Sequence, residues 1–394
     1  MRLCVSPILF CLAVVPSRSA TVLVMPFHNS SHFSDLNWVG ESISETLMTE
    51  FSGANEIVLS RTVRAEAMHR LSLRPDADYT KATLIRIGQT ADADYLCSGS
   101  FDINLPPEST QPKDSSIRIT AQFMDLRKMH DGPEISEAGK LTELARLEEH
   151  LAYESVKYLE PHANLRLEDF LSPQKTFRLD AEESYIRGLM SANKEQKQKW
   201  FLQAAALDSK FPGPAYELGR SALEEKQYAQ AIDWFRRIQP TDPSYIEARF
   251  RMGLAAYGAG DYSSAALYFR EVAKPYPLSE VYNDLGAAES QLNQPAAAED
   301  FRRALESDPN NPTYLFNVGV ALLKSNSYDE AAKRFQQVLA HEPNDAEGRA
   351  LLDRARRREP LPPGSSAPAQ RLKTSFNETA FRQLKAMLRA KRAE

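Results

Sequence analysis

The chain has 394 residues, which is enough for two or three domains with sizeable cores. Its hydrophobic content of 42% and charged content of 26% are ordinary for a globular protein. The formal net charge of −5 is mild, and this balance gives no reason to expect a nucleic-acid partner.

The first 19 residues predict an export signal. An apolar run at residues 8–15 follows a short basic start, and Ser17 and Ser19 are small residues at the −3 and −1 positions of a cleavage site. The apolar run is shorter than the roughly 20 residues that span a bilayer. A membrane anchor that stays in place is the alternative. We therefore expect a periplasmic or secreted protein with a signal peptide at residues 1–19.

Two of the three cysteines lie within this signal, so an exported chain keeps only Cys97 and cannot form an intrachain disulfide. Cys97 lies within residues 92–101, an apolar stretch that is typical of a strand. This context predicts an inert core residue and not a catalytic thiol.

Residues 20–160 alternate between strand patterns and helix patterns. Apolar residues every second position predict a half-buried strand at 115–127, and apolar residues four apart predict an amphipathic helix at 38–51. The other expected elements are strands at 21–27 and 56–60, helices at 61–71 and 141–159, and a helix, a turn and a strand within 81–101. This alternation predicts an α/β module, a small sheet covered by helices.

The module resembles the amino-terminal domain of the periplasmic protein TolB. The resemblance rests on the order of the segments "VLVMPF", "WVGESISETLMTEF", "EIVLSR" and "IGQTADADYLCSGSFD". It implies a module that binds partner proteins and has no enzymatic activity. Residues 104–116 depart from the pattern as a Pro/Ser-rich hairpin loop, and residues 161–179, which have little periodicity, form a connector.

Four sequence marks recur together at intervals of 32 to 34 residues farther along the chain. They are glycine (Gly219, Gly253, Gly286, Gly319), alanine (Ala231, Ala265, Ala298, Ala331), phenylalanine (Phe235, Phe269, Phe301, Phe335) and proline (Pro243, Pro277, Pro309, Pro343). The third unit is one residue short, so Ala297 is the alternative to Ala298. The pattern resembles the tetratricopeptide repeat, whose helix-turn-helix units stack into an all-α superhelix.

Packing explains these residue types. Glycine and alanine let two helices touch closely, phenylalanine fills the gap beside them, and proline ends a unit because it lacks an N–H. A degenerate first unit, with Tyr185, Gly188, Phe201 and Ala205, precedes the four regular ones. The sequence therefore predicts about five repeats at residues 180–344 and a polar capping helix at 345–359.

The end of the chain is predicted to hold a Pro/Ser linker at residues 360–373 and a basic amphipathic helix at 374–394. From Arg371 onward there are seven basic and two acidic residues. Ser375 and Glu378 have the spacing of a capping box. The helix either docks on an acidic partner or membrane surface, or folds back on the repeats or frays in solvent.

No motif of enzyme chemistry occurs in the chain. It has no phosphate-binding loop, dinucleotide fingerprint, serine-hydrolase elbow or zinc-protease motif. His28 and His32 are four apart in a loop, where the spacing fixes no metal geometry. We therefore expect no catalytic site, no cofactor and no metal.

The resemblance to tetratricopeptide repeats implies a peptide-binding groove along the first helix of each unit. The implied groove residues are Tyr216, Arg220, Leu223, Phe250, Leu254, Tyr257, Asn283, Phe316, Val320 and Leu323, with Ala287 and Ser290 at two further positions. Only Asn283 fits the family's carboxylate clamp. The predicted groove is mostly aromatic and aliphatic and suits an extended or helical peptide with apolar anchors, unless the capping or carboxy-terminal helix covers it.

These features predict an exported, non-enzymatic interaction scaffold that binds a protein or peptide partner. Two alternatives remain open. One is an accessory or regulatory subunit of a cell-envelope assembly or cell-wall enzyme complex, and the other is an enzyme with an unrecognised site in the first module.

Overall fold

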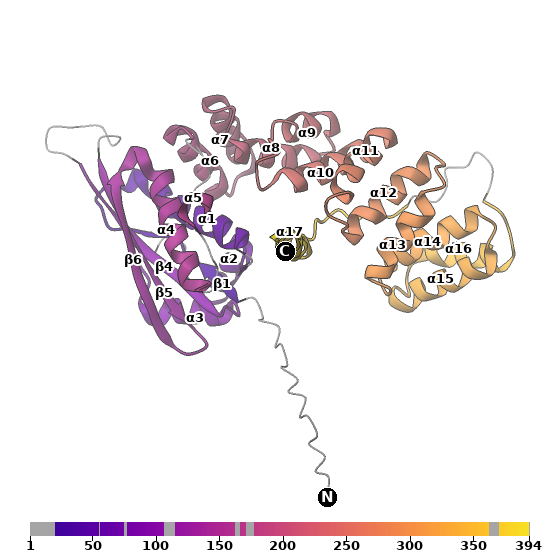
Figure 1. Cartoon of the computed structure of the whole chain (residues 1–394), viewed down its shortest axis with the longest axis horizontal. Helices are drawn as coiled ribbons and strands as arrows, with labels where there is room; N and C mark the ends of the chain where they lie inside the picture. Colours follow the sequence, from indigo (N-terminus) through magenta and orange to yellow (C-terminus); the bar gives the residue numbers. More distant parts are fainter. Residues whose placement is uncertain are drawn as a thin grey trace, which may run out of the picture. The chain divides into compact units, whose positions relative to one another are not determined.

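The computed structural model describes residues 20–54, 56–74, 77–105, 115–161, 166–170, 177–361 and 370–393. The chain divides into two compact units between residues 172 and 173 (Figure 1). The predicted signal at residues 1–19, most of the predicted hairpin loop and most of the predicted linker lie outside the described residues.

The first unit is an α/β domain built on a six-stranded sheet. The strand order is β3-β1-β4-β5-β6, with β2 also pairing β4. β1 runs parallel to β3 and β4, whereas β4, β5 and β6 are antiparallel neighbours. The elements are β1 (Thr21–Val24), β2 (His28–Asn29), α1 (Trp38–Gly53), β3 (Ile57–Val58), α2 (Arg61–Arg70), α3 (Lys81–Thr90), β4 (Tyr95–Asn104), β5 (Ser116–Asp125), β6 (His130–Lys140), α4 (Leu144–Leu159) and α5 (Leu167–Phe170).

Two of the strands were not predicted from the sequence. β2 is a two-residue strand inside a polar loop. β6 is an edge strand in which every residue is exposed or only partly buried, so it carries no apolar alternation that would reveal it. It pairs with β5 as the second strand of a hairpin, from Asp125 opposite His130 to Ser116 opposite Lys140.

Close backbone packing joins the first strand to α1. A Cβ on Gly40 would stand 2.0 Å from the carbonyl oxygen of Phe27, and the N–H of Phe27 donates to the carbonyl of Gly40 at 3.0 Å. Only glycine fits such an approach. Beside it, buried Arg64 of α2 contacts Glu41 of α1 at 2.5 Å and donates to the carbonyl of Val24 at 3.0 Å. These contacts tie α1, α2 and β1 together.

The second unit is all helical. Five antiparallel helix pairs and a further helix follow one another, and a separate carboxy-terminal helix completes the described part (Figure 1). The pairs are α6 (Leu179–Met190) with α7 (Lys194–Leu207), α8 (Pro212–Glu224) with α9 (Tyr228–Phe235), α10 (Tyr245–Gly258) with α11 (Tyr262–Ala273), α12 (Ser279–Gln291) with α13 (Ala297–Ser307), and α14 (Pro312–Lys324) with α15 (Tyr328–His341); then come α16 (Ala346–Arg356) and α17 (Glu378–Ala393). The predicted α/β module followed by a helical array is confirmed.

A glycine–phenylalanine contact holds each pair together. A Cβ added to the glycine of the first helix would lie 2.5 to 2.9 Å from the phenylalanine ring of the second helix. The contacts join Gly188 to Phe201, Gly219 to Phe235, Gly253 to Phe269, Gly286 to Phe301 and Gly319 to Phe335. In the short third unit Ala297 is buried and Ala298 is exposed, so Ala297 takes the alanine position.

A left-handed residue ends the first helix in each of the four regular pairs. Lys226, Gly260, Asn293 and Asn326 all have φ between 54° and 80°. Each of these residues and its successor donate back into the helix; for example, the N–H of Gln227 donates to the carbonyl of Ala222 at 2.8 Å. This geometry is a Schellman cap, for which glycine and then asparagine are the least strained residues.

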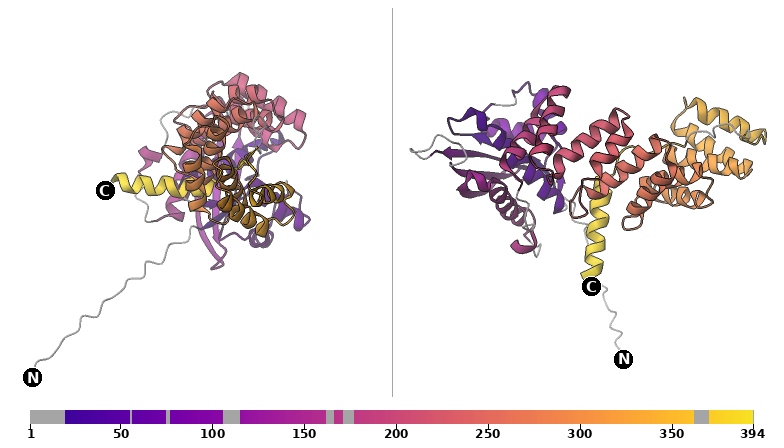
Figure 2. Two further views of the ribbon diagram at one scale, coloured as in Figure 1. Left: turned by 90° about the vertical axis from the view of Figure 1, so that its right-hand side faces the viewer. Right: turned by 90° about the horizontal axis from the view of Figure 1, so that it is seen from above.

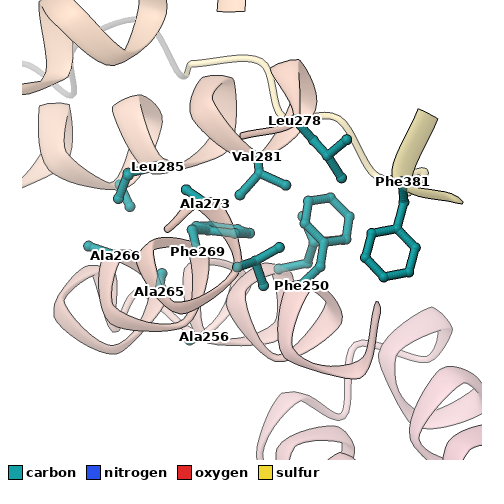
Figure 3. Packing of buried hydrophobic residues seen from close by; sticks show 13 residues of the cluster. Phe250, Ala256, Ala265, Ala266, Phe269, Ala273, Leu278, Val281, Leu285 and Phe381 are labelled. Carbon is teal, nitrogen blue, oxygen red and sulfur yellow. The ribbon is translucent and has the colours of Figure 1, made fainter. Parts of the chain in front are cut away.

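Residues 370–377 form an extended segment that leads into α17 and lies against the helical array. Asn377 caps α17, because its side chain accepts the N–H of Ala380 at 3.0 Å. The cap is therefore Asn377 and not Ser375 as the sequence spacing predicted. Figure 3 shows Phe381 beside Phe250 and Leu278, and beyond it α17 runs away from the helix pairs (Figure 2).

Candidate peptide groove

The first helices α10, α12 and α14 hold most of the predicted groove residues. Phe250, Phe316 and Val320 have no exposed surface, and Leu323 and Leu254 are 1% and 7% exposed. Their side chains pack inside the array, and the two phenylalanines contact phenylalanines of the second helices. Phe250 lies 5.7 Å from Phe269, and Phe316 lies 5.8 Å from Phe335. Phe316, Val320 and Leu323 belong to one buried hydrophobic cluster with Leu351 and Leu352 of α16.

The remaining predicted positions lie nearer the surface. Arg220 is paired with Glu217 at 2.6 Å, and Tyr216 accepts a hydrogen bond from Arg251 at 3.1 Å. Leu223 and Tyr257 are partly buried at the edge of the hydrophobic cluster, and burial raises the pKa of Tyr257 to about 12. The predicted residues on α8 therefore contact other residues of the array.

Two asparagines on neighbouring first helices hold the backbone of Arg371. The Nδ2 atoms of Asn283 and Asn317 both donate to the carbonyl oxygen of Arg371, at 2.9 and 2.8 Å. The Oδ1 atom of Asn317 accepts the N–H of Arg371 at 2.8 Å, and Asn317 also donates to Asn283 at 2.8 Å. Both asparagines have no exposed surface. This pair satisfies both backbone polar groups of Arg371, its N–H and its C=O, through side-chain amides.

Two carboxylates on α12 continue this backbone recognition. Asp284 Oδ1 accepts the N–H of Lys373 at 2.9 Å, and Glu280 Oε1 accepts the N–H of Asn377 at 2.9 Å. Burial raises the pKa of Asp284 well above its ordinary value, against the hydrogen bonds from Lys373 and Asn283. The N–H groups of residues 371, 373 and 377 thus donate to side chains of the array.

Gln370 is held by its side chain at the start of the segment. It donates to the Ser290 hydroxyl at 2.6 Å and accepts from Gln291 at 2.7 Å. Lys324 of α14 donates to the same hydroxyl at 2.8 Å. Ser290 was one of the implied groove positions, and it contacts the segment.

The side chain of Arg371 is recognised by an aromatic ring and acidic groups. Its guanidinium carbon lies 3.6 Å from the centroid of the Phe316 ring, and its Nη2 lies 2.7 Å from Asp345. Partial burial works to raise the pKa of Asp345, but the hydrogen bonds from Gly348 and Arg371 outweigh it, so the pKa is lowered. Glu342 and Glu347 lie 3.4 and 3.6 Å from the guanidinium group.

Aromatic contacts anchor the other end of the segment. Phe376 lies 5.5 Å from Phe250 and 5.3 Å from Phe381, and Phe381 lies 4.7 Å from Tyr276. Phe381 is only 7% exposed. The first turns of α17 therefore fold back on the array, whereas contact of the helix with an acidic partner or a membrane stays a prediction.

The groove is more polar than the sequence predicted: Asn283 and Ser290 were among the predicted positions, whereas other polar residues that contact the segment were not. Counting from each glycine selected Phe316 and passed over Asn317, Asp284 and Glu280. A weak signal was present, because Asn283 and Asn317 lie three and two residues before the repeat glycines Gly286 and Gly319 on successive first helices. Counting a single fixed offset from each glycine could find only one of them.

The other candidate side chains give no sign of chemistry. Cys97 has no exposed surface, and burial raises the pKa of its thiol, which disfavours the reactive thiolate. Within the described residues, no three histidine, cysteine, aspartate or glutamate side chains gather as metal ligands. In that same part of the chain no helix is long and apolar enough to cross a membrane.

Comparison with known protein families identifies the helix pairs. Models of the tetratricopeptide repeat match residues 201–246, 247–279 and 293–355. The helical unit is a tetratricopeptide-repeat array. Such arrays are protein-interaction scaffolds.

Individual proteins are similar over limited lengths. Sperm-associated antigen 1 of Mus musculus is 30% identical over 106 residues, which is 27% of this chain and 12% of that protein. The solved structure of YrrB, described as a TPR protein with an unusual peptide-binding site, has 18% identity over 45% of this chain and 92% of its own, with a TM-score of 0.38. The LpoB C-terminal domain from Salmonella enterica has 19% identity over 32% of this chain and 87% of its own, with a TM-score of 0.24. At these scores the structural likenesses carry no functional argument.

Proposed function

We propose that the protein is an exported, non-enzymatic scaffold that binds an extended segment of a partner protein along α10, α12 and α14. One observation carries the proposal: Asn283 and Asn317, both fully buried, present their amides to the backbone of an extended chain. A buried amide is costly unless its donors and acceptor are satisfied. Two amides that bind the N–H and the C=O of one residue therefore support a site for peptide backbone.

The geometry suits binding by main-chain hydrogen bonds together with a few side-chain pockets, a mode that combines affinity with modest sequence demands. The Phe316 ring and the Asp345 carboxylate form one pocket, and Phe250 forms part of another. The function proposed for these contacts is binding.

Cross-linking in cells tests this proposal. A photo-reactive cross-linker on the chain should capture a partner whose yield falls strongly in the double variant Asn283→Ala, Asn317→Ala. The control is Gln336→Ala, an exposed glutamine on α15, which should leave the yield unchanged. A partner captured equally by all three proteins would place its site elsewhere than the groove.

Export is part of the proposal and rests on the basic, apolar and small-residue regions of residues 1–19. Mass spectrometry of the protein from its source cells should find an amino terminus at Ala20 or Thr21. An intact Met1 on protein from the cytoplasmic fraction would contradict export. The resemblance of residues 20–160 to the TolB amino-terminal domain supports a second partner-binding module, which the same cross-linking on that unit would test.

A further inference from the structure

The segment that occupies the groove belongs to the same chain. Backbone groups of residues 371, 373 and 377 occupy side-chain donors and acceptors of Asn283, Asn317, Asp284 and Glu280. A partner peptide that used the same groups would need the position that this segment holds. The two binding events are therefore mutually exclusive by geometry.

The docked segment also shows which side chains the groove selects. Arg371 reaches Phe316 and Asp345, Leu372 packs against the clusters around Phe250 and Phe301, and Phe376 reaches Phe250. Thr374 and Ser375 between them are exposed. The selected pattern is an arginine, an aliphatic residue directly after it, and an aromatic residue five positions after the arginine.

Charge favours the same class of ligand. Four carboxylates besides the buried Asp284 lie at the segment, namely Glu280, Glu342, Asp345 and Glu347. Two basic side chains, Arg371 and Lys373, face aromatic rings of α14. An acidic peptide would place like charges together at this surface, whereas a basic peptide is complementary to it.

We propose that residues 370–381 are an intramolecular competitor, and that the array binds in trans an extended basic peptide of this same pattern once the segment has left the groove. The proposal rests on the function proposed above and adds the ligand class and its control. When only a fraction of the protein is free of its own segment, the apparent affinity for a partner falls by that fraction. Release of the segment should therefore raise the apparent affinity.

Peptide binding to the full chain tests the competition. The probe is a fluorescein-labelled synthetic peptide of residues 370–381, measured by fluorescence anisotropy. The released variant is Arg371→Ala with Phe376→Ala, which changes the segment and leaves the groove residues in place. The matched control is Met387→Ala, in the same tail but 69% exposed. We expect the released variant to bind the peptide at least about ten-fold more tightly than the wild type and the control.

Changes in the probe test the recognition pattern without altering the protein. A peptide with the Arg371 amide N-methylated cannot donate to Asn317, and a peptide with glutamate in place of both basic residues carries the wrong charge. Each should bind the released variant at least about ten-fold more weakly than the parent peptide. Asn317→Asp added to the released variant should weaken binding of the parent peptide by a similar factor.

Each result decides a different part of the proposal. Equal affinities for the wild type and the released variant would overturn the competition. Failure of the released variant to bind the parent peptide would overturn the recognition pattern, while loss of a cross-linked partner in the asparagine variants would still support the proposed function. A doubled mass of the wild type in light scattering, returning to a monomer in the released variant, would show the segment in the groove of a second copy and overturn the intramolecular arrangement.

Discussion

At the scale of single residues, some residues of the array pack its helices together and others bind the backbone of the carboxy-terminal segment. The repeated glycines and phenylalanines fix the distance between paired helices, and a side chain on Gly253 would lie 2.5 Å from the Phe269 ring. The asparagines at 283 and 317 do not contribute to that packing and would be costly without partners. Polar residues buried on first helices therefore mark the site, and the repeated small residues mark the fold.

Gly253→Leu should destabilise the array by several kcal/mol, because it overpacks a contact that has no room for a methyl group. Denaturant unfolding followed by circular dichroism measures the change. Ala298→Leu, at an exposed position of the same array, is the control and should stay within about 0.5 kcal/mol of the wild type. Equal stability of the Gly253 variant and the wild type would show that the helix pairs pack differently.

A buried carboxyl makes the stability of the array depend on pH. Burial and the nearby Glu289 raise the pKa of Asp300 from 3.8 to about 7. Because this folded-state pKa lies above the unfolded one, the stabilising contribution of Asp300 is complete below pH 4 and is lost as the pH rises through 7. Asp300→Asn keeps the shape and removes the titration.

We therefore expect Asp300→Asn to be more stable than the wild type at pH 8, by about 1 kcal/mol, and the difference to shrink at pH 5. Thermal unfolding of both proteins at the two pH values measures this difference. Burial and the nearby Glu160 also raise the pKa of Glu56 in the first unit to about 7. Glu56 titrates equally in both proteins, so its contribution cancels in the stability difference between the variant and the wild type. If Asp300→Asn were more stable than the wild type at pH 5 and less stable at pH 8, the pKa of Asp300 would be lowered and not raised.

At the scale of elements, the helices could be predicted because their signals are local. Four-residue periodicity and the recurring glycine and proline locate α8 to α15, and apolar alternation locates β5. The edge strand β6 has no such signal, because its side chains are mostly polar and none of them is fully buried. The segment at residues 370–373 was predicted as linker because no periodicity marks it; its order comes from partners about 55 to 90 residues earlier in the chain.

At the left-handed residue that follows a first helix, replacing glycine should destabilise the array and introducing glycine should stabilise it. Gly260→Ala puts a Cβ into open space but on a residue with φ of +80°, so it should cost about 1 kcal/mol through the backbone alone. Lys226→Gly removes a strained residue with φ of +60° and should stabilise by up to about 0.5 kcal/mol, since the flexibility of glycine in the unfolded chain offsets part of the gain. Chemical denaturation of both variants checks the signs, and two changes of the same sign would rule out the shared cap.

At the scale of the whole molecule, the chain combines an α/β domain with a repeat array whose groove its own carboxy-terminal segment fills. The repeat pattern alone predicts an interaction scaffold. The occupant could not be predicted, because its contacts with the array depend on main-chain groups of residues 371, 373 and 377, which every sequence possesses. What distinguishes this segment is the combination of Arg371, Leu372 and Phe376 with the pockets that receive them.

Hydrogen–deuterium exchange of the intact protein tests the central claim, that the array holds an extended backbone through Asn283, Asn317 and Asp284. The amides of Arg371 and Lys373 donate to Asn317 and Asp284, so we expect them to exchange far more slowly than those of an unstructured peptide, and Asn283→Ala with Asn317→Ala to abolish the protection. Exchange of residues 370–377 at the unstructured rate in the wild type would contradict the account.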